Sequence, residues 1–131
     1  MEKIYQDIAT KYAYFIDTKA FEKLNEILWE NFSMTGVFEL HGAENFIASL
    51  HQLNQFDATL HRLSNFYIHK INNEFINASC YCVASHITNE NSKSANLEMG
   101  IIYADILEKR EDKIKILERN FKLVWQEQRK L

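Results

Sequence analysis

The hydrophobic period of this chain changes once, near residue 58, and that change constrains the fold more than any other feature. Beyond it, long segments rich in β-branched and aromatic residues cover positions 58–71, 74–88, 95–110 and 112–128. Short polar connectors separate these segments at 72–73, 89–94 and 111–112. Segments of this composition, bounded by turn-forming Asn, Asp and Ser, are typical of consecutive β-strands. The sequence therefore predicts four strands in succession.

The first 57 residues instead show the three-to-four-residue spacing of amphipathic helices. Apolar side chains recur on one side of a first helix over 3–16, at Ile4, Ile8, Tyr12 and Phe15. A second helix is expected over 17–29 and a third over 43–56, with a strand over 30–40 between them. Asp17 or Thr18 can cap the second helix, because such side chains accept hydrogen bonds from a free helix N-terminus.

This order of elements predicts an α+β fold, in which three N-terminal helices cover one face of a curved, mostly antiparallel sheet. A sheet of four long strands that curves strongly encloses a space between itself and the helices, and a ligand pocket is expected there. The length of 131 residues suits one domain spanning 1–131.

Charge and composition exclude several classes of function. The net charge is −3 and no long basic run occurs, so we expect no nucleic-acid partner. No apolar run approaches the roughly 20 residues that cross a membrane, and the N-terminus does not resemble a signal peptide. Cys80 and Cys82 lie two apart with no further ligands at metal-binding spacing, which favours free thiols in a reducing cytoplasm. We expect neither a metal nor a cofactor.

Four segments, taken in order, resemble the SnoaL-like branch of the NTF2-like superfamily: "YAYFIDTKAFEKL", "DATLHRLSN", "MGIIYADILEKREDKIKI" and "LERNFKLVW". Within that superfamily the chain is most similar to the scytalone dehydratase and hexachlorocyclohexane dehydrochlorinase type. The resemblance covers nearly the whole chain and implies a cone of curved sheet closed by three helices. It also implies that Asp17 and His61 form a catalytic Asp–His dyad, with His86 as a second catalytic histidine on the next strand.

The scytalone dehydratase branch carries a tyrosine directly before the aspartate and another on the first strand, and this chain lacks both. Ile16 stands in the first of these places. Tyr14 lies three residues before Asp17, so the two share a helix face. Tyr103 and Asp105 share a face of their strand. We expect Tyr14, Tyr103 and Asp105 to contact the substrate in place of the missing tyrosines.

The chemistry that the resemblance implies is β-elimination or isomerisation, begun by proton abstraction next to a carbonyl or a leaving group. A histidine base suits this step, since its ordinary pKa of about 6.5 lies near the working pH. A buried carboxylate holds the ring in one tautomer and stabilises the imidazolium. The sequence thus favours a cofactor-independent lyase or isomerase that acts on a small, apolar, cyclic molecule.

Two other functions stay open at this point. The missing tyrosines suit a domain of the same fold that binds a small molecule without chemistry, because a fold does not determine a function. The alternation of Phe121, Leu123 and Trp125 predicts an apolar strand face that forms a homodimer through the open side of the sheet. The two dyad residues also have simple structural roles open to them. Asp17 can be a helix cap, and His61 can be a core histidine.

Overall fold

A computed structural model describes all residues of the chain, from Met1 to Leu131. The helices are α1 (Glu2–Asp17), the 3₁₀ helix η1 (Phe21–Glu26), α2 (Ala43–Leu50) and the 3₁₀ helix η2 (His51–Gln55). The strands are β1 (Leu28–Gly36), β2 (Leu40–His41), β3 (Ala58–Ile71), β4 (Phe75–Glu90), β5 (Lys93–Arg110) and β6 (Lys113–Lys130). The four long strands predicted from residue 58 onward are therefore present.

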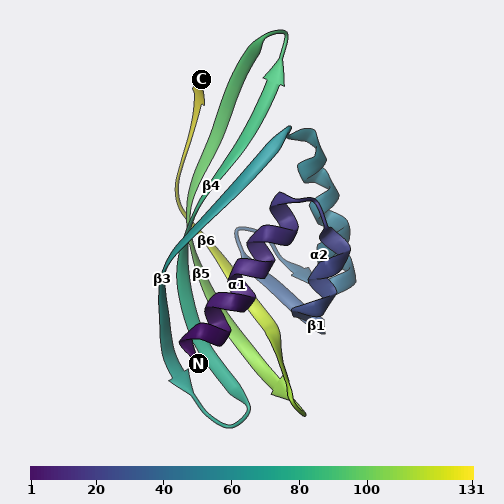
Figure 1. Cartoon of the computed structure of the whole chain (residues 1–131), viewed down its shortest axis with the longest axis vertical. Coiled ribbons are helices and arrows are strands. Elements are labelled where there is room, and N and C mark those ends of the chain that lie inside the picture. Colours follow the sequence, from purple (N-terminus) through teal and green to yellow (C-terminus); the bar gives the residue numbers. More distant parts are fainter.

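The six strands form one sheet in the order β2-β1-β6-β5-β4-β3. All neighbours are antiparallel except β1 and β6, which pair in parallel. The sheet is long and curved, and the helices pack on its concave side while the convex side is left uncovered (Figure 1). This arrangement confirms the α+β prediction of a curved, mostly antiparallel sheet covered by N-terminal helices.

The second helix is shorter than the spacing predicts. The chain forms only a 3₁₀ segment over Phe21–Glu26, and Leu28 already belongs to β1. Leu28 pairs in parallel with Ile116 of β6, whose N–H donates to the carbonyl of Ile27 at 2.9 Å. Because this pairing with a distant strand requires extended backbone, it overrides the local helical spacing. The third expected helix likewise tightens into a 3₁₀ segment after Leu50.

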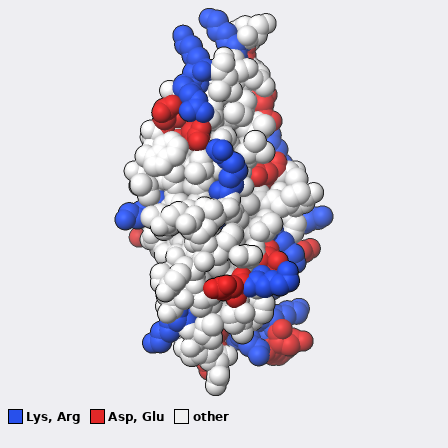
Figure 2. Space-filling view, turned by 60° about the vertical axis from the view of Figure 1, so that its left-hand side comes forward, with Lys and Arg blue, Asp and Glu red and all other residues white.

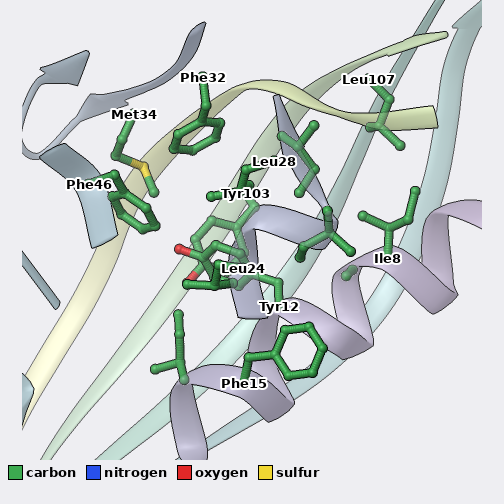
Figure 3. Packing of buried hydrophobic residues seen from close by; sticks show 14 of the residues in the cluster. Ile8, Tyr12, Phe15, Leu24, Leu28, Phe32, Met34, Phe46, Tyr103 and Leu107 are labelled. Carbon is green, nitrogen blue, oxygen red and sulfur yellow. The ribbon is translucent and has the colours of Figure 1, made fainter. Parts of the chain in front are cut away.

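The hydrophobic core lies between the helices and the concave face of the sheet (Figure 3). In helix α1, Ile8, Tyr12 and Phe15 are buried, as the spacing predicts. Ile4 is 38% exposed, and its neighbour Tyr5 is buried instead. Fully burying an aliphatic or aromatic side chain contributes about 1.5–3 kcal/mol. These buried side chains therefore fix which side of α1 faces the sheet.

A bulge in β6 changes which side chains share a face of that strand. Gly100 of β5 is opposite Trp125, yet the next residue, Ile101, is opposite Leu123, so Val124 is an extra residue in β6. Phe121 and Leu123 line a cavity on the concave side. Trp125 packs on the convex side, where its indole lies so close over Gly100 that a Cβ there would be 1.9 Å from Nε1. The prediction that Phe121, Leu123 and Trp125 share one face of the strand is therefore wrong.

Candidate active site

A cavity of about 570 Å³ lies between the concave face of the sheet and the helices. Ligand pockets for small molecules commonly have about 300–1,000 Å³. Of its 19 lining residues 13 are hydrophobic, and the lining contains no lysine or arginine. Tyr12 and Ile16 of α1 form one wall, and residues 37–40, between β1 and β2 and at the start of β2, form part of the lining. His61 and His86 bring imidazole groups to this largely apolar space, whose other polar lining residues are Glu39, Ser49, Gln52 and Gln126.

Asp17 and His61 are in direct contact. Nδ1 of His61 lies 2.6 Å from Oδ1 of Asp17, and the backbone N–H of His61 donates to Oδ2 at 2.9 Å. The hydroxyl of Thr59 also donates to Oδ1, at 2.9 Å. The side chains are only 19% and 8% exposed, for Asp17 and His61 respectively. Strand β3 therefore supplies three donors to the carboxylate at the end of α1.

The structure contradicts the capping role considered for Asp17. Asp17 is the last residue of α1, and the cap of η1 is Ala20, which has no side-chain capping bond. The hydroxyl of Thr18 bonds backwards to the carbonyl of Tyr14 at 2.7 Å. The Asp17 carboxylate is instead directed at β3, where the strand backbone and two side chains hold it.

The hydrogen bonds of the dyad determine its protonation. Burial by itself would raise the pKa of Asp17, because it opposes the charged carboxylate. This effect is outweighed by the hydrogen bonds from the ring and backbone of His61, by the imidazolium charge and by the hydrogen bond from Thr59, so the pKa of Asp17 is lowered. An ionised carboxylate only accepts hydrogen bonds, so Nδ1 of His61 carries a proton. In the neutral ring, Nε2 then has a free lone pair. This is the arrangement that a general base requires.

His86 is buried beside His61, with ring centroids 6.1 Å apart and the rings nearly perpendicular. Its Nδ1 lies 2.9 Å from the carbonyl oxygen of Leu97, so that nitrogen is the donor. Burial lowers the pKa of His86, the Leu97 bond opposes this, and the positive charge of His61 lowers it further. His86 is therefore a neutral imidazole at neutral pH, and its Nε2 is an acceptor.

Tyr14 and Asp105 do not line the cavity. Tyr14 is 64% exposed, because α1 turns the Tyr12 side of the helix to the sheet and position 14 lies about 200° around the axis from position 12. Asp105 is fully buried and paired through both oxygens with Arg119, at 2.7 and 2.8 Å, and it accepts a hydrogen bond from Tyr5. The expectation that these two residues contact a substrate directly is thus not supported by their positions.

Tyr103 does line the cavity, and Tyr12 lies beside it, with ring centroids 6.0 Å apart. Sequence reasoning assigned Tyr12 only to the core stripe of α1. The signal that could have revealed it is chemical, because a tyrosine on a core-facing helix stripe carries a hydroxyl that needs a polar partner or a cavity.

Comparisons with known proteins identify the family and the fold of the chain. The family model described as the SnoaL-like domain matches residues 3–120. The chain belongs to the SnoaL-like domain family. Residues carrying the dyad and the second histidine all lie inside the matched part. No curated protein matches the chain.

Several solved structures share the fold of this SnoaL-like chain at low sequence identity. A scytalone dehydratase-like protein of Novosphingobium aromaticivorans is 19% identical, with a TM-score of 0.81 over 94% of this chain and 83% of that one. A hexachlorocyclohexane dehydrochlorinase, LinA type 2, is 17% identical, with a TM-score of 0.82 over 97% and 86%. LinA type 3 of Novosphingobium barchaimii is 16% identical, with a TM-score of 0.81 over 97% and 87%. These similarities establish a common fold.

Proposed function

We propose that this protein is a cofactor-independent lyase or isomerase that acts by proton abstraction within a single domain. The observation that carries the proposal is the 2.6 Å contact between Asp17 and Nδ1 of His61 at the edge of an apolar cavity. Similarity to scytalone dehydratase-like and dehydrochlorinase structures supports the same class of reaction. The alternative is a domain of this fold that binds a small molecule without chemistry.

In the proposed reaction, Nε2 of His61 takes a proton from carbon. The resulting imidazolium is stabilised by the ionised Asp17, which keeps Nδ1 as the donor. In an elimination, the leaving hydroxide then takes this proton and departs as water. In an isomerisation, the proton returns to another carbon of the same molecule. Proton transfer by a positioned group contributes about 10²–10⁴ in rate.

His86 acts in this scheme as a neutral acceptor. Its Nδ1 proton is engaged by Leu97, so only Nε2 can meet a ligand. A hydroxyl group of the substrate can donate to Nε2, and this orients the molecule relative to His61. The depressed pKa of His86 supports this role, because a second imidazolium beside that of His61 would be unfavourable.

The lining of the cavity favours a neutral, largely apolar, cyclic substrate. The absence of Lys and Arg among the lining residues removes any counter-charge for a carboxylate or phosphate. Glu39, which lines the cavity near Phe38, further disfavours an anion. A volume of about 570 Å³ accommodates one or two fused rings with short substituents.

Exchange of α-protons in deuterium oxide tests the proposal without knowledge of the natural substrate. Cyclic ketones, incubated with the protein and followed by NMR, should exchange their α-protons faster than in buffer. His61→Gln should remove this acceleration, whereas His69→Gln should retain it, since His69 is exposed and bonds Ser79 away from the cavity. Unchanged exchange in His61→Gln, or a bound ligand that survives wild-type protein intact, would favour the binding-domain alternative.

We also propose that the protein forms a homodimer through the convex face of the sheet. Leu60, Tyr67, Tyr81 and Trp125 lie on this face and are 44–61% exposed. Figure 2 shows a broad uncharged area with Lys, Arg, Asp and Glu mostly around its margins. Exposed apolar patches of this kind commonly mark interfaces. Light scattering should find a dimer at micromolar concentration, and Tyr81→Glu should dissociate it; a wild-type monomer would contradict the proposal.

Helices in this chain are too short or too polar to cross a bilayer. Cys80 and Cys82 are both buried and unpaired with each other, which supports the proposal of a reducing, cytoplasmic setting.

A further inference from the structure

His86 is held by the neighbouring strand at its backbone as well as at its ring. The backbone N–H of His86 donates to Oδ1 of Asn96 at 3.1 Å, and the ring Nδ1 donates to the carbonyl of Leu97 at 2.9 Å. The register of β4 and β5 places His86 opposite Leu97, so Asn96 is the next residue along β5. His86 and Asn96 are only 6% and 3% exposed. The amide of Asn96 is therefore one of the groups that fix the position of His86.

Asn96 holds His86 from outside the cavity. Met99 of the same strand lines the cavity, whereas Asn96 and Glu98 do not. Successive residues of a strand point to opposite faces, so Asn96 and Glu98 share the convex side of β5. Asn96 therefore has no contact with the space that a substrate would occupy. Any effect of this residue on a reaction must pass through His86.

The orientation of the Asn96 amide is set by Glu98. Nδ2 of Asn96 donates to Oε2 of Glu98 at 3.0 Å. An ionised carboxylate only accepts hydrogen bonds, so the NH₂ group must face Glu98 and the amide oxygen must face the N–H of His86. Glu98 in turn accepts from Arg62 at 3.2 Å and from Arg129 at 3.1 Å. These two arginines hold the carboxylate in place, and with it the acceptor that is presented to His86.

The bond from Asn96 matters for the ring because a buried backbone N–H requires an acceptor. Without the amide oxygen, the N–H of His86 would have to turn toward another acceptor, and the ring would move with the backbone. The hydrogen bond from Nδ1 to Leu97 depends on that position. Once this bond is lost, the proton of the neutral ring can occupy either nitrogen, and Nε2 is no longer always an acceptor.

We propose that Asn96 is a positioning residue that acts through the backbone of His86 and keeps Nε2 of this histidine an acceptor toward the cavity. This inference rests on the proposed function, in which Nε2 of His86 accepts a hydrogen bond from a hydroxyl group of the substrate. It extends that function by making the selectivity for hydroxylated substrates depend on a group on the convex side of the sheet. Loss of Asn96 should therefore affect substrates that carry a hydroxyl group and spare those that do not.

Nitrogen-15 NMR of the His86 ring tests the positioning role without any substrate. In the wild type, the two ring nitrogens should give well-separated signals, as expected of one tautomer. Asn96→Leu has a similar volume but no acceptor, so it should bring the two signals closer together and speed exchange of the Nδ1 proton with water about tenfold. The matched control is Asn77→Leu, the same replacement at an exposed position of β4, which should leave the His86 signals unchanged. Urea denaturation verifies that each variant folds.

Two ketones test the consequence for selectivity. Cyclohexanone has no hydroxyl group for His86, whereas its β-hydroxy derivative has one. In deuterium oxide, Asn96→Leu should slow the exchange of α-protons about tenfold for the β-hydroxy derivative and leave the rate for cyclohexanone within twofold of wild type. General damage to the site would slow both. Asn96→Asp keeps an oxygen opposite the N–H of His86, so it should restore the single tautomer and most of the rate with the β-hydroxy derivative.

The results separate the positioning role from the proposed catalysis. If Asn96→Leu changes the His86 signals while wild-type protein exchanges neither ketone, the positioning role stands and the catalytic proposal fails. If His86 keeps its single tautomer and its slow Nδ1 exchange in folded Asn96→Leu, or if both ketones slow equally, the inference is overturned. Should Asn96→Leu fail to fold, Asn96→Ala removes the same acceptor without bulk, and the same outcomes decide.

Discussion

Replacing Asp17 with asparagine removes the charge of the dyad and leaves its shape nearly unchanged. The wild-type carboxylate accepts three hydrogen bonds, two at Oδ1 from Thr59 and the His61 ring and one at Oδ2 from the backbone N–H of His61. An asparagine amide has only one acceptor oxygen, so it cannot satisfy all three donors. Its NH₂ group must therefore face either the backbone N–H or the imidazole of His61.

Each orientation of the introduced amide has a different consequence, and the two can be told apart. If the NH₂ group faces the backbone, the buried N–H of His61 loses its partner, which costs about 1–3 kcal/mol of unfolding free energy. If it faces the ring, it donates to Nδ1 and forces the His61 proton onto Nε2. The lone pair that would take a substrate proton is then lost. Either way, we expect the rate of ketone α-proton exchange to fall by about 10²-fold or more.

The stability of the wild type relative to Asp17→Asn should depend on pH with a definite sign. The folded state lowers the pKa of Asp17, so the ionised carboxylate contributes stability that is present above its unfolded value of about 3.9. That contribution is lost as the pH falls through the lower folded pKa. The difference in unfolding free energy between the two proteins should therefore be largest at pH 7 and decrease at acidic pH.

Urea denaturation from pH 3 to pH 7 measures the stability difference, and nitrogen-15 NMR of the imidazole reports which ring nitrogen carries the proton. Asp7→Asn is the matched control, because Asp7 is exposed on the same helix and makes only a 3.9 Å contact with Lys3. The reasoning is refuted if Asp17→Asn keeps both the wild-type tautomer of His61 and the wild-type exchange rate. In that case the contact would be structural and the binding-domain alternative would gain support.

Two further predictions concern buried charge. Asp105→Asn leaves the Arg119 guanidinium buried without a counter-ion, so it should lower the free energy of unfolding by about 3–5 kcal/mol, as measured by urea denaturation. Adding Arg119→Met to Asp105→Asn removes the unpaired charge and should recover much of that loss. A double variant as unstable as Asp105→Asn alone would contradict this explanation. Burial lowers the pKa of His86, so near pH 6.5 this histidine is protonated in the unfolded chain but stays neutral in the folded chain. The free energy of unfolding should therefore fall as the pH decreases through that value. His86→Gln should flatten this part of the profile, whereas His69→Gln should not; equal slopes in both variants would exclude His86 as the cause.

Much of the architecture could be predicted from the sequence because its signals are local. The four strands and their connectors follow from composition and turn residues, and the buried stripe of α1 follows from its spacing. Similarity to the SnoaL-like family placed Asp17 and His61 together across 44 residues, which no local pattern could do. Local reasoning alone left Asp17 as a plausible helix cap, since nothing near it in the chain reveals the donors of β3.

Only the tertiary structure decided the features that depend on pairing between distant segments. The parallel pairing of Leu28 with Ile116 converts the end of a helical pattern into strand. The extra residue Val124 in β6 sends Leu123 into the cavity and Trp125 to the opposite face, against the simple alternation of a strand. The curved sheet and the rotation of α1 likewise select Tyr12 rather than Tyr14 for the cavity. Periodicity sets which side of an element is apolar, but strand register, bulges and curvature set which side chains meet in one space.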